Sequence, residues 1–339
     1  MNSRSLHYWH PVLASRDLPR NRVVAVKVAG HSIALFRKGD GRLGAVADQC
    51  AHRRMKLSLG SVEQGRLICP YHGWSYTSEG HGESPSAPKM QACVRKYGCA
   101  EASGAIWINA GANGENPPTL AMDGWKSVDP VCTRMRAPLE LVIDNFSEIE
   151  HTVAMHPVFG FDPARASEAV VELETRDDSI TVRNRGPAKM PPIDMRLALA
   201  LRRGDHFQSD YTFRFDPPRS SVTHTWSEPH TGRERRLKYH LYFYFVPEDA
   251  TTTNVVTFGL LKIGWPVFRH LTGQLSWLFR RRIRQAVEED AFIVENLADK
   301  SPDLAGMKLS RFDPILGLTR ERLRRIYYEV PNELSDRRT

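Results

Sequence analysis

Two short segments of the sequence each pair a cysteine with a histidine. The first is Cys50-Ala-His52 and the second, after sixteen intervening residues, is Cys69-Pro-Tyr-His72. Two thiolates and two imidazoles can hold either a tetrahedral zinc ion or a 2Fe-2S cluster with cysteines on one iron and histidines on the other. Zinc fingers usually present their cysteines as one pair and their histidines as another, whereas here each segment supplies one of each. The spacing therefore favours an iron-sulfur cluster held from two sides, with zinc as the alternative.

A second set of metal ligands is indicated between Asp144 and Pro157, where His151 and His156 lie five residues apart. On an ideal α-helix Asp144, Glu148 and His151 share one face, but His156 is rotated by about 140° from His151. Both histidines could bind one metal only if the helix contained a π-type turn or ended before Pro157. Two histidines and one carboxylate form the facial triad of non-haem Fe(II) sites, which leaves positions on the iron open for O2 and substrate.

A distant helix offers the carboxylate. The helix predicted for residues 274–298 has a core-facing stripe with 4-3-4-3 spacing, made of Ile283, Val287, Asp290, Val294 and Leu297. An ionised carboxylate in an apolar stripe is costly unless a metal or a cation pairs with it, so Asp290 is a candidate ligand. Its neighbour Glu289 lies off the stripe and is expected to face solvent. Two alternatives stay open, because Asp290 could form a buried ion pair and Glu148 could complete the triad with the two histidines.

The elements that must position these residues form two groups. Short β segments broken by glycine within residues 23–108 predict a small all-β domain. Residues 110–118, rich in glycine, asparagine and proline, are typical of a linker. Residues 170–261 contain further strands, and a long helix closes the chain. Several antiparallel strands with segregated helices make the second domain α+β, and we place the two domains at residues 1–115 and 116–339.

Length and composition narrow the class of protein. A chain of 339 residues fits two domains that each bury a core. The net charge of +8 does not indicate nucleic-acid binding, because 47 basic residues are dispersed among 39 acidic ones. The lack of a signal sequence argues against disulfides, so Cys93, Cys99 and Cys132 are expected to be structural thiols. The longest apolar stretch is interrupted by Lys262, and we expect a soluble, cytoplasmic protein without a membrane span.

The segments that carry the candidate ligands resemble a known family. CAHRRMKLSLG and CPYHGW, the opening YWHPV at residues 8–12 and the two ligand-bearing helices are similar to the Rieske non-haem iron oxygenases, which are the terminal components of ring-hydroxylating and O-demethylating systems. The resemblance covers nearly the whole chain and is strongest to the vanillate and dicamba demethylases. It implies an N-terminal all-β Rieske domain followed by a catalytic domain of helix-grip type, in which helices cover a curved antiparallel sheet.

By position, the resemblance assigns the metal ligands. It implies that the 2Fe-2S cluster is bound by Cys50, His52, Cys69 and His72. It also implies that a mononuclear Fe(II) is bound by His151, His156 and Asp290. Glu148 takes the place of an acid, more usually Asp, that joins His151 through its second oxygen to His72 of a neighbouring subunit. Asn145 either contacts the iron site or is an ordinary amide on the helix surface.

The resemblance also implies partners. Electrons come from NAD(P)H through a flavin-dependent reductase, with or without a ferredoxin, and the oxygenase is a homotrimer that takes O2 and a small-molecule substrate. One loop departs from the family pattern, because Arg54 stands where glycine is common and Lys56 where an apolar residue or proline is common. Together with Arg53, these side chains form either a docking rim for an acidic electron donor or an ordinary solvated surface.

The expected activity is hydroxylation or oxidative demethylation of a small aromatic substrate. A desaturase or an amine N-demethylase would share the same motifs, whereas a Rieske electron carrier would leave the second domain without a purpose. Apolar side chains of the second sheet that could line a substrate pocket or belong to the core are Met190, Ile193, Met195, Phe207, Tyr211, Trp226, Tyr239, Phe243 and Phe245. The polar candidates for substrate contact are Arg183, Arg185, His206 and His224.

Overall fold

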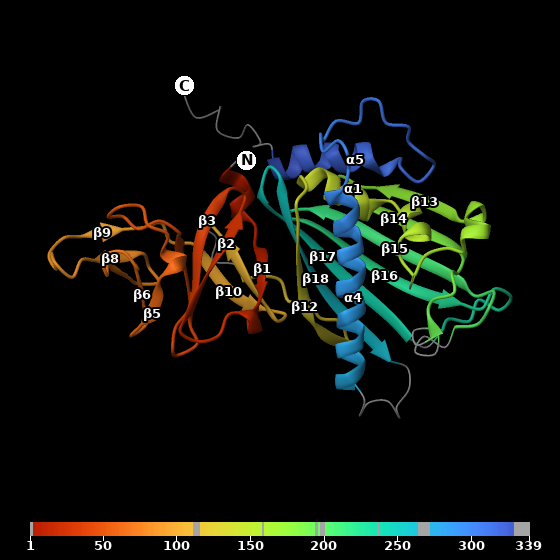
Figure 1. Cartoon of the computed structure of the whole chain (residues 1–339). Coiled ribbons are helices and arrows are strands. Elements are labelled where there is room, and N and C mark those ends of the chain that lie inside the picture. The colour runs from red at the N-terminus through yellow and green to blue at the C-terminus, as the bar shows by residue number, and fades with distance from the viewer. Residues whose placement is uncertain are drawn as a thin grey trace, which may run out of the picture.

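The computed structural model describes residues 3–110, 116–157, 159–193, 196, 201–235, 237–263 and 272–328. Figure 1 shows an N-terminal group of short strands beside a large sheet, with the long helix α4 (Thr272–Glu295) lying across that sheet. Part of the expected linker, with the domain boundary inside it, lies outside the described residues. Within the described residues, none of the helices combines the length and the hydropathy that a membrane crossing requires.

The N-terminal part consists of three small antiparallel sheets with the orders β1-β11-β10, β2-β3-β4 and β5-β6-β7-β8-β9. The strands are β1 (His10–Ala14), β2 (Arg22–Val28), β3 (His31–Arg37), β4 (Leu43–Ala47), β5 (Ser61–Glu63), β6 (Arg66–Ile68), β7 (Ser75–Tyr76), β8 (His81–Glu83), β9 (Ala92–Cys93), β10 (Gly98–Ala102) and β11 (Ala105–Asn109). The short 3-10 helix η1 (Ser3–His7) precedes these strands, and two more, η2 (Ser15–Asp17) and η3 (Leu57–Leu59), lie between them. The prediction of an N-terminal β domain is confirmed.

The second part is built on one antiparallel sheet of seven strands in the order β12-β18-β17-β16-β15-β14-β13. The strands are β12 (Lys126–Met135), β13 (Val170–Thr175), β14 (Ser179–Pro187), β15 (His206–Phe215), β16 (Pro218–Ser227), β17 (Leu237–Asp249) and β18 (Thr252–Ile263). Side chains along β15 and β16 alternate between buried and half-buried, because successive residues of a strand point to opposite faces of the sheet.

Helices segregate from this sheet, as the α+β prediction requires. They are α1 (Leu139–Ser147), α2 (Glu150–Ala154), the 3-10 helix η4 (Pro163–Glu168), α4, α5 (Ile315–Arg322) and the π-helical segment η6 (Leu323–Tyr328). The predicted long helix is confirmed, with its end at Glu295, but it does not close the chain, because α5 and η6 follow it. Ile283, Val287 and Val294 of its stripe are buried, but Leu297 is 39% exposed and lies beyond the helix, so its place in the stripe is wrong.

The large sheet has a hydrophobic core on each face. Phe243 and Phe245 of β17 belong to the core that also holds Ile283 and Val287 of α4. Tyr244 of β17 points the other way and belongs to the core of the N-terminal part. There the ring of Trp107 lies 5.0 Å from that of Tyr244 and 5.6 Å from that of Phe258. The sheet therefore lies between the N-terminal part and the helices. A functional site of the second part must lie on the face of the sheet that the helices cover.

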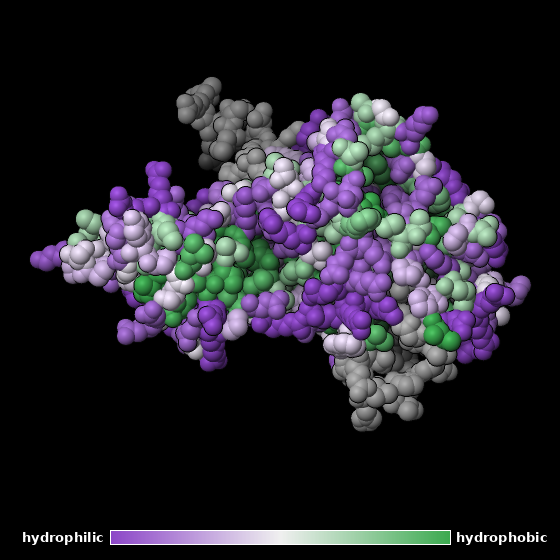
Figure 2. Space-filling view, in the orientation of Figure 1, coloured by the Kyte–Doolittle hydropathy of each residue, from purple (hydrophilic) through white to green (hydrophobic). Residues whose placement is uncertain are grey.

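The surface differs between the two parts. Figure 2 shows hydrophilic residues over α4, whereas hydrophobic residues gather over the N-terminal strands β1 to β3. On β2, Val23, Val24 and Val26 are only half-buried. An exposed hydrophobic area of this kind is typical of a surface that another protein covers.

Candidate functional site

The two Cys-His segments form loops of the same construction. The N–H of Arg54 donates to the carbonyl oxygen of Cys50 at 2.9 Å, and the N–H of Gly73 donates to that of Cys69 at 3.1 Å. In each loop the donor is the fourth residue after the cysteine and has a positive φ, 59° for Arg54 and 69° for Gly73. Glycine adopts this conformation at little cost, whereas a residue with a side chain does not. The backbone therefore favours glycine at the position that arginine occupies here.

These loops bury the sulfur atoms and expose the imidazoles. Cys50 and Cys69 are each 2% exposed, and the hydroxyl of Tyr76 lies 3.1 Å from Sγ of Cys50. His52 and His72 are exposed, and their ring centroids are 4.6 Å apart. Two buried thiols beside two paired surface imidazoles fit a 2Fe-2S cluster whose cysteine-bound iron is inside and whose histidine-bound iron is at the surface.

An interrupted helix places the second pair of histidines. α1 ends before Glu148, whose backbone is extended (φ −107°, ψ 155°), and α2 begins two residues later. His151 lies on α2, and His156 follows the end of α2, next to Pro157. Of the two alternatives, a π-type turn and a helix that ends before Pro157, the structure shows the second. The expectation that Asp144, Glu148 and His151 share one helical face is wrong, because the break at Glu148 separates the two helices.

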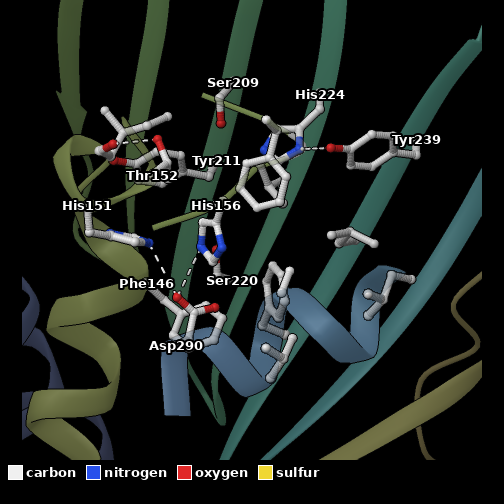
Figure 3. Close-up of a pocket in the computed structure, with 18 of the residues that line it drawn as sticks. Phe146, His151, Thr152, His156, Ser209, Tyr211, Ser220, His224, Tyr239 and Asp290 are labelled. Atoms are coloured by element: carbon white, nitrogen blue, oxygen red, sulfur yellow. Dashed lines mark hydrogen bonds and ion pairs between the residues drawn. The ribbon is translucent and has the colours of Figure 1, made fainter. Parts of the chain in front are cut away.

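Asp290 on α4 meets both of these histidines. Its Oδ1 lies 3.3 Å from Nε2 of His151 and 3.3 Å from Nε2 of His156, as the dashed lines in Figure 3 show. One ligand atom from each of the three side chains lies within 4.8 Å of the other two. Asp290 is 5% exposed, in agreement with its predicted place in the buried stripe. The chemistry and spacing of the three groups fit a non-haem Fe(II) ion.

Hydrogen bonds among the three groups decide their charges. Burial disfavours the charged form of each, yet the hydrogen bonds reverse this effect. The pKa of His151 rises to about 10 and that of His156 also rises, because both imidazoles bond to Asp290. The pKa of Asp290 stays well below its usual range for the same reason. Metal binding must therefore displace protons that the three side chains share.

Asn145 and Glu148 both contact this triad. Nδ2 of Asn145 donates to Oδ1 of Asp290 at 2.9 Å, and Asn145 is buried, so its reading as a helix-surface amide is wrong. Oε1 of Glu148 accepts from Nδ1 of His151 at 2.5 Å. Its other oxygen accepts from the backbone N–H of Glu150 at 2.5 Å and of His151 at 3.1 Å. The expectation of a spare second oxygen is therefore wrong, because that oxygen caps α2.

The sequence prediction for Glu289 is also wrong. Oε2 of Glu289 accepts from Nδ1 of His156 at 2.8 Å, and its side chain is 23% exposed. Its Oε1 accepts from Nε2 of Gln285 at 2.9 Å, one helical turn earlier. The segment that follows α2 passes beside α4 and brings His156 next to Glu289. Glu289, which was expected to be solvated, therefore hydrogen-bonds to His156. The available signal was a carboxylate adjacent to Asp290, which is a weak one.

Two further charged groups hold the segment in place. Nζ of Lys189 donates to the carbonyl oxygens of Val153 at 2.7 Å and of His156 at 2.9 Å. Asp144 forms an ion pair with Arg320 of α5. Burial raises the pKa of Asp144 to about 6, although Arg320 opposes the shift. Sequence reasoning found neither Lys189 nor Arg320, because both lie far along the chain from the residues that they contact.

A cavity lies beside the triad, between the sheet and α4. Its walls are mainly aromatic and aliphatic, and the polar side chains among them, apart from the triad and Glu148, are Thr152, Ser209, Tyr211, Ser220, His224, Tyr239 and Arg282. Figure 3 shows His156 and Asp290 at one end of this space and His224 with Tyr239 farther along it.

The candidates for substrate contact divide into three groups. Those that line the cavity are Tyr211, His224, Tyr239 and Phe243. Those that lie in the core beside it are Phe207, Trp226 and Phe245. The other described candidates do not line it: Met190 and His206 are half-buried, Ile193 is 64% exposed, Arg185 is also exposed, and Arg183 pairs with Glu174. Met195 lies outside the described residues.

Two family models match the chain. Residues 8–98 match the Rieske 2Fe-2S domain, and residues 135–326 match the vanillate O-demethylase oxygenase C-terminal domain. The first match contains both Cys-His loops, and the second contains His151, His156 and Asp290. The second match alone covers more than half of the chain.

Curated relatives and solved structures agree with these matches. Chlorophyllide a oxygenase of Oryza sativa subsp. japonica is 33% identical over 154 residues, which is 44% of this chain and 28% of that protein. Methylxanthine N1-demethylase NdmA of Pseudomonas putida is 32% identical over 191 residues, which is 50% of this chain and 52% of that protein. The chain thus spans about half or less of these relatives.

The fold agrees over a greater length. A crystal structure of dicamba monooxygenase bound to 3,6 dichlorosalicylic acid superposes with a TM-score of 0.79 at 16% identity. The superposition covers 95% of this chain and 97% of that one. At this identity the similarity concerns the fold, including the pairing of an N-terminal β domain with the large antiparallel sheet.

Proposed function

Because the chain belongs to the Rieske oxygenases with a C-terminal domain of the vanillate O-demethylase type, we propose that it is a terminal oxygenase that hydroxylates or oxidatively demethylates a small aromatic substrate. The observation that carries this proposal is the convergence of His151, His156 and Asp290 on a largely apolar cavity. A non-catalytic electron carrier would need neither the second ligand set nor the cavity.

The cofactors are a 2Fe-2S cluster and a mononuclear iron. We assign the cluster to Cys50, His52, Cys69 and His72, and the iron to His151, His156 and Asp290. Bound there, the two groups supply single electrons and activate O2. The protein's contribution is to hold the ligands, since Glu148 and Glu289 keep the Nδ1 protons of the two histidines in place and leave Nε2 as the ligand atom.

The two cofactors belong to separate domains, for which we propose residues 1–115 and 116–339. The separate family matches at residues 8–98 and 135–326 support this division. So does the separation of the cluster loops, in the small N-terminal sheets, from the triad, on the helical face of the large sheet.

A terminal oxygenase of this kind needs an electron donor and a small-molecule substrate. We propose a flavin-dependent reductase, with or without a ferredoxin, as the donor. Arg53, Arg54 and Lys56 are all exposed beside His52 and His72, and their charge suits an acidic partner. The cytoplasm, where NAD(P)H is available, is the compartment that fits this arrangement.

A homotrimer is the proposed assembly, with Glu148 between subunits. Each carboxylate oxygen can accept two hydrogen bonds, so Glu148 can accept a further one from His72 of the partner subunit although both its oxygens are already bonded. The half-buried valines of β2 and the hydrophobic area over β1 to β3 support burial of the N-terminal part against another subunit.

Demethylation is the favoured form of the reaction. NdmA is an N1-demethylase, and residues 135–326 match the vanillate O-demethylase oxygenase C-terminal domain. Ring hydroxylation and desaturation would need the same iron triad. A product analysis must therefore distinguish demethylation from these two reactions.

The test is a substrate panel with cluster-loaded, iron-loaded protein, a surrogate reductase and NADH. Aryl methyl ethers, N-methylated heterocycles and aromatic acids are incubated with 18O2, and products are scored by mass and by formaldehyde release. We expect an oxygenated or demethylated product from at least one member, and no product from Asp290→Ala with an unchanged cluster spectrum. The proposal would be contradicted if the reconstituted protein contained no acid-labile sulfide, or if it bound zinc in place of the cluster.

A further inference from the structure

One polar pair stands apart in the cavity. His224 on β16 and Tyr239 on β17 are opposite each other in the register of the two strands. Nδ1 of His224 lies 2.7 Å from the hydroxyl of Tyr239, and both residues are buried while lining the cavity. Figure 3 shows this pair on the sheet, separated from the labelled residues of the triad.

The second ring nitrogen of His224 has no hydrogen-bond partner among the described residues. Within the described part of the chain, Nδ1 is the ring nitrogen of His224 that hydrogen-bonds. The residue is only 6% exposed, but its Nε2 atom is not fully enclosed by protein atoms. This nitrogen therefore opens onto the cavity. A nine-tenths buried imidazole with an open nitrogen loses hydrogen-bonding energy unless a ligand or water completes it.

The pair is electrically neutral. Burial lowers the pKa of His224 to about 3 and raises that of Tyr239 well above its usual range. In the tautomer that we assign, the Tyr239 hydroxyl donates to Nδ1 of the neutral imidazole. The imidazole proton then lies on Nε2, which makes this atom a hydrogen-bond donor directed at the cavity.

An aromatic ring bridges His224 and the triad. The ring of Phe159 lies 4.6 Å from that of His156 and 5.3 Å from that of His224. The ring of Phe207 also lies 5.2 Å from that of His224. A flat molecule lying along Phe159 would reach from the iron ligands at one end to Nε2 of His224 at the other.

The charge balance near His224 disfavours an anion. Among the described residues that line the cavity, Arg282 is the one with a permanent positive charge, and its Nη1 donates to Gln285 on α4. Burying a carboxylate against a neutral imidazole leaves its charge uncompensated and is costly. A carbonyl, ether or hydroxyl oxygen would accept the Nε2–H bond without this cost.

We propose that His224, oriented by Tyr239, is a specificity-determining residue that donates a hydrogen bond to an uncharged oxygen of a flat substrate whose reacting end lies at the triad. The inference rests on the proposed oxygenase function and adds the substrate class, which is neutral rather than anionic. Arg282 is the competing anchor, and it would select a carboxylate.

The test compares two nearly isosteric probes, 3-methoxybenzamide and 3-methoxybenzoate, by anaerobic equilibrium binding to the iron-loaded, cluster-loaded protein. We expect the amide to bind at least tenfold more tightly than the acid. His224→Phe should weaken amide binding at least tenfold, and Tyr239→Phe should weaken it severalfold. His224→Gln, which restores a donor, should recover part of the affinity. His206→Phe, a histidine outside the cavity, is the matched control.

Three results would overturn the proposal. In the first, the acid binds more tightly than the amide, and Arg282→Gln abolishes binding of the acid. In the second, His224→Phe or Tyr239→Phe binds the amide as tightly as the parent protein does. In the third, the amide does not bind at millimolar concentration. If His224→Phe does not fold, Tyr239→Phe alone decides. Binding is measured without turnover, so a failure here is distinguishable from failure of the oxygenase proposal, which appears as missing sulfide, missing iron or absent products.

Discussion

Glu289 accepts a hydrogen bond from Nδ1 of His156 over 2.8 Å and so turns Nε2 of that histidine toward Asp290. Glu148 does the same for His151 from the opposite side of the triad. Each candidate histidine ligand therefore has its own carboxylate on the outer nitrogen. Such partners fix the tautomer and the ring orientation of metal-bound histidines.

Removal of the Glu289 side chain should weaken binding of the mononuclear metal ion and leave the 2Fe-2S cluster unchanged. Glu289→Ala frees the His156 ring, and loss of such a partner typically costs about 10- to 100-fold in metal affinity. Glu289→Gln keeps an acceptor oxygen and should lose less. The measurement is Fe(II) or Co(II) titration of protein with an intact cluster spectrum. Glu288→Gln, one residue away and exposed, is the control, and equal affinity in Glu289→Ala would show that the bond does not matter.

Glu148 should matter for turnover more than for metal content. Glu148→Gln loses the charge that holds the Nδ1 proton of His151 and weakens the further hydrogen bond that we propose from His72 of the partner subunit. We expect both metals to stay bound while turnover falls at least tenfold, with Glu148→Asp less affected. Turnover and metal content are measured on the same samples. Loss of the mononuclear iron alone would make Glu148 a ligand, and parent-like turnover would remove its bridging role.

Arg54→Gly separates backbone strain from charge. The φ of 59° at Arg54 costs roughly 1 kcal/mol for a residue with a side chain, so the glycine variant should raise the free energy of unfolding by about that amount. It also removes a charge from the proposed docking rim, so reduction by an acidic donor should slow and lose salt dependence. Arg54→Ala, which removes the charge and keeps the strain, should slow reduction equally without the gain in stability.

Arg54→Gly is measured by urea unfolding and by stopped-flow reduction at two salt concentrations. Reduction at the parent rate in both variants would show that Arg54 plays no part in docking.

Acid should destabilise the protein through His10. Burial lowers the folded-state pKa of His10 to about 4, below its ordinary value of 6.5, so the folded state favours the neutral form. The resulting stability is present above pH 6.5 and is lost as the pH falls toward 4, by about 2 kcal/mol between pH 7 and 5. His10→Phe, which cannot ionise, should show a smaller loss in urea unfolding over that interval. An equal loss would assign the acid sensitivity to other groups.

Several features could be read from the sequence because they are local. The spacing of Cys50, His52, Cys69 and His72 predicted a cluster held from two sides, since each segment supplies one cysteine and one histidine. The stripe on α4 predicted the burial of Asp290, because helical periodicity decides which face packs on the sheet. The restriction that proline places on the preceding residue made a helix end before Pro157 one of the two alternatives for His151 and His156.

Other features depended on contacts between distant segments. Glu289 looked solvated on its own helix, and only the chain after α2, which brings His156 across it, gave it a partner. The open nitrogen of His224 became visible only once β17 placed Tyr239 beside it and α4 closed the cavity. Periodicity reports which face of an element is buried, but not which side chain of another element meets it. The ligand types were therefore set by local sequence, whereas their hydrogen-bond partners and the polarity of the cavity were decided by the packing of α4 on the sheet.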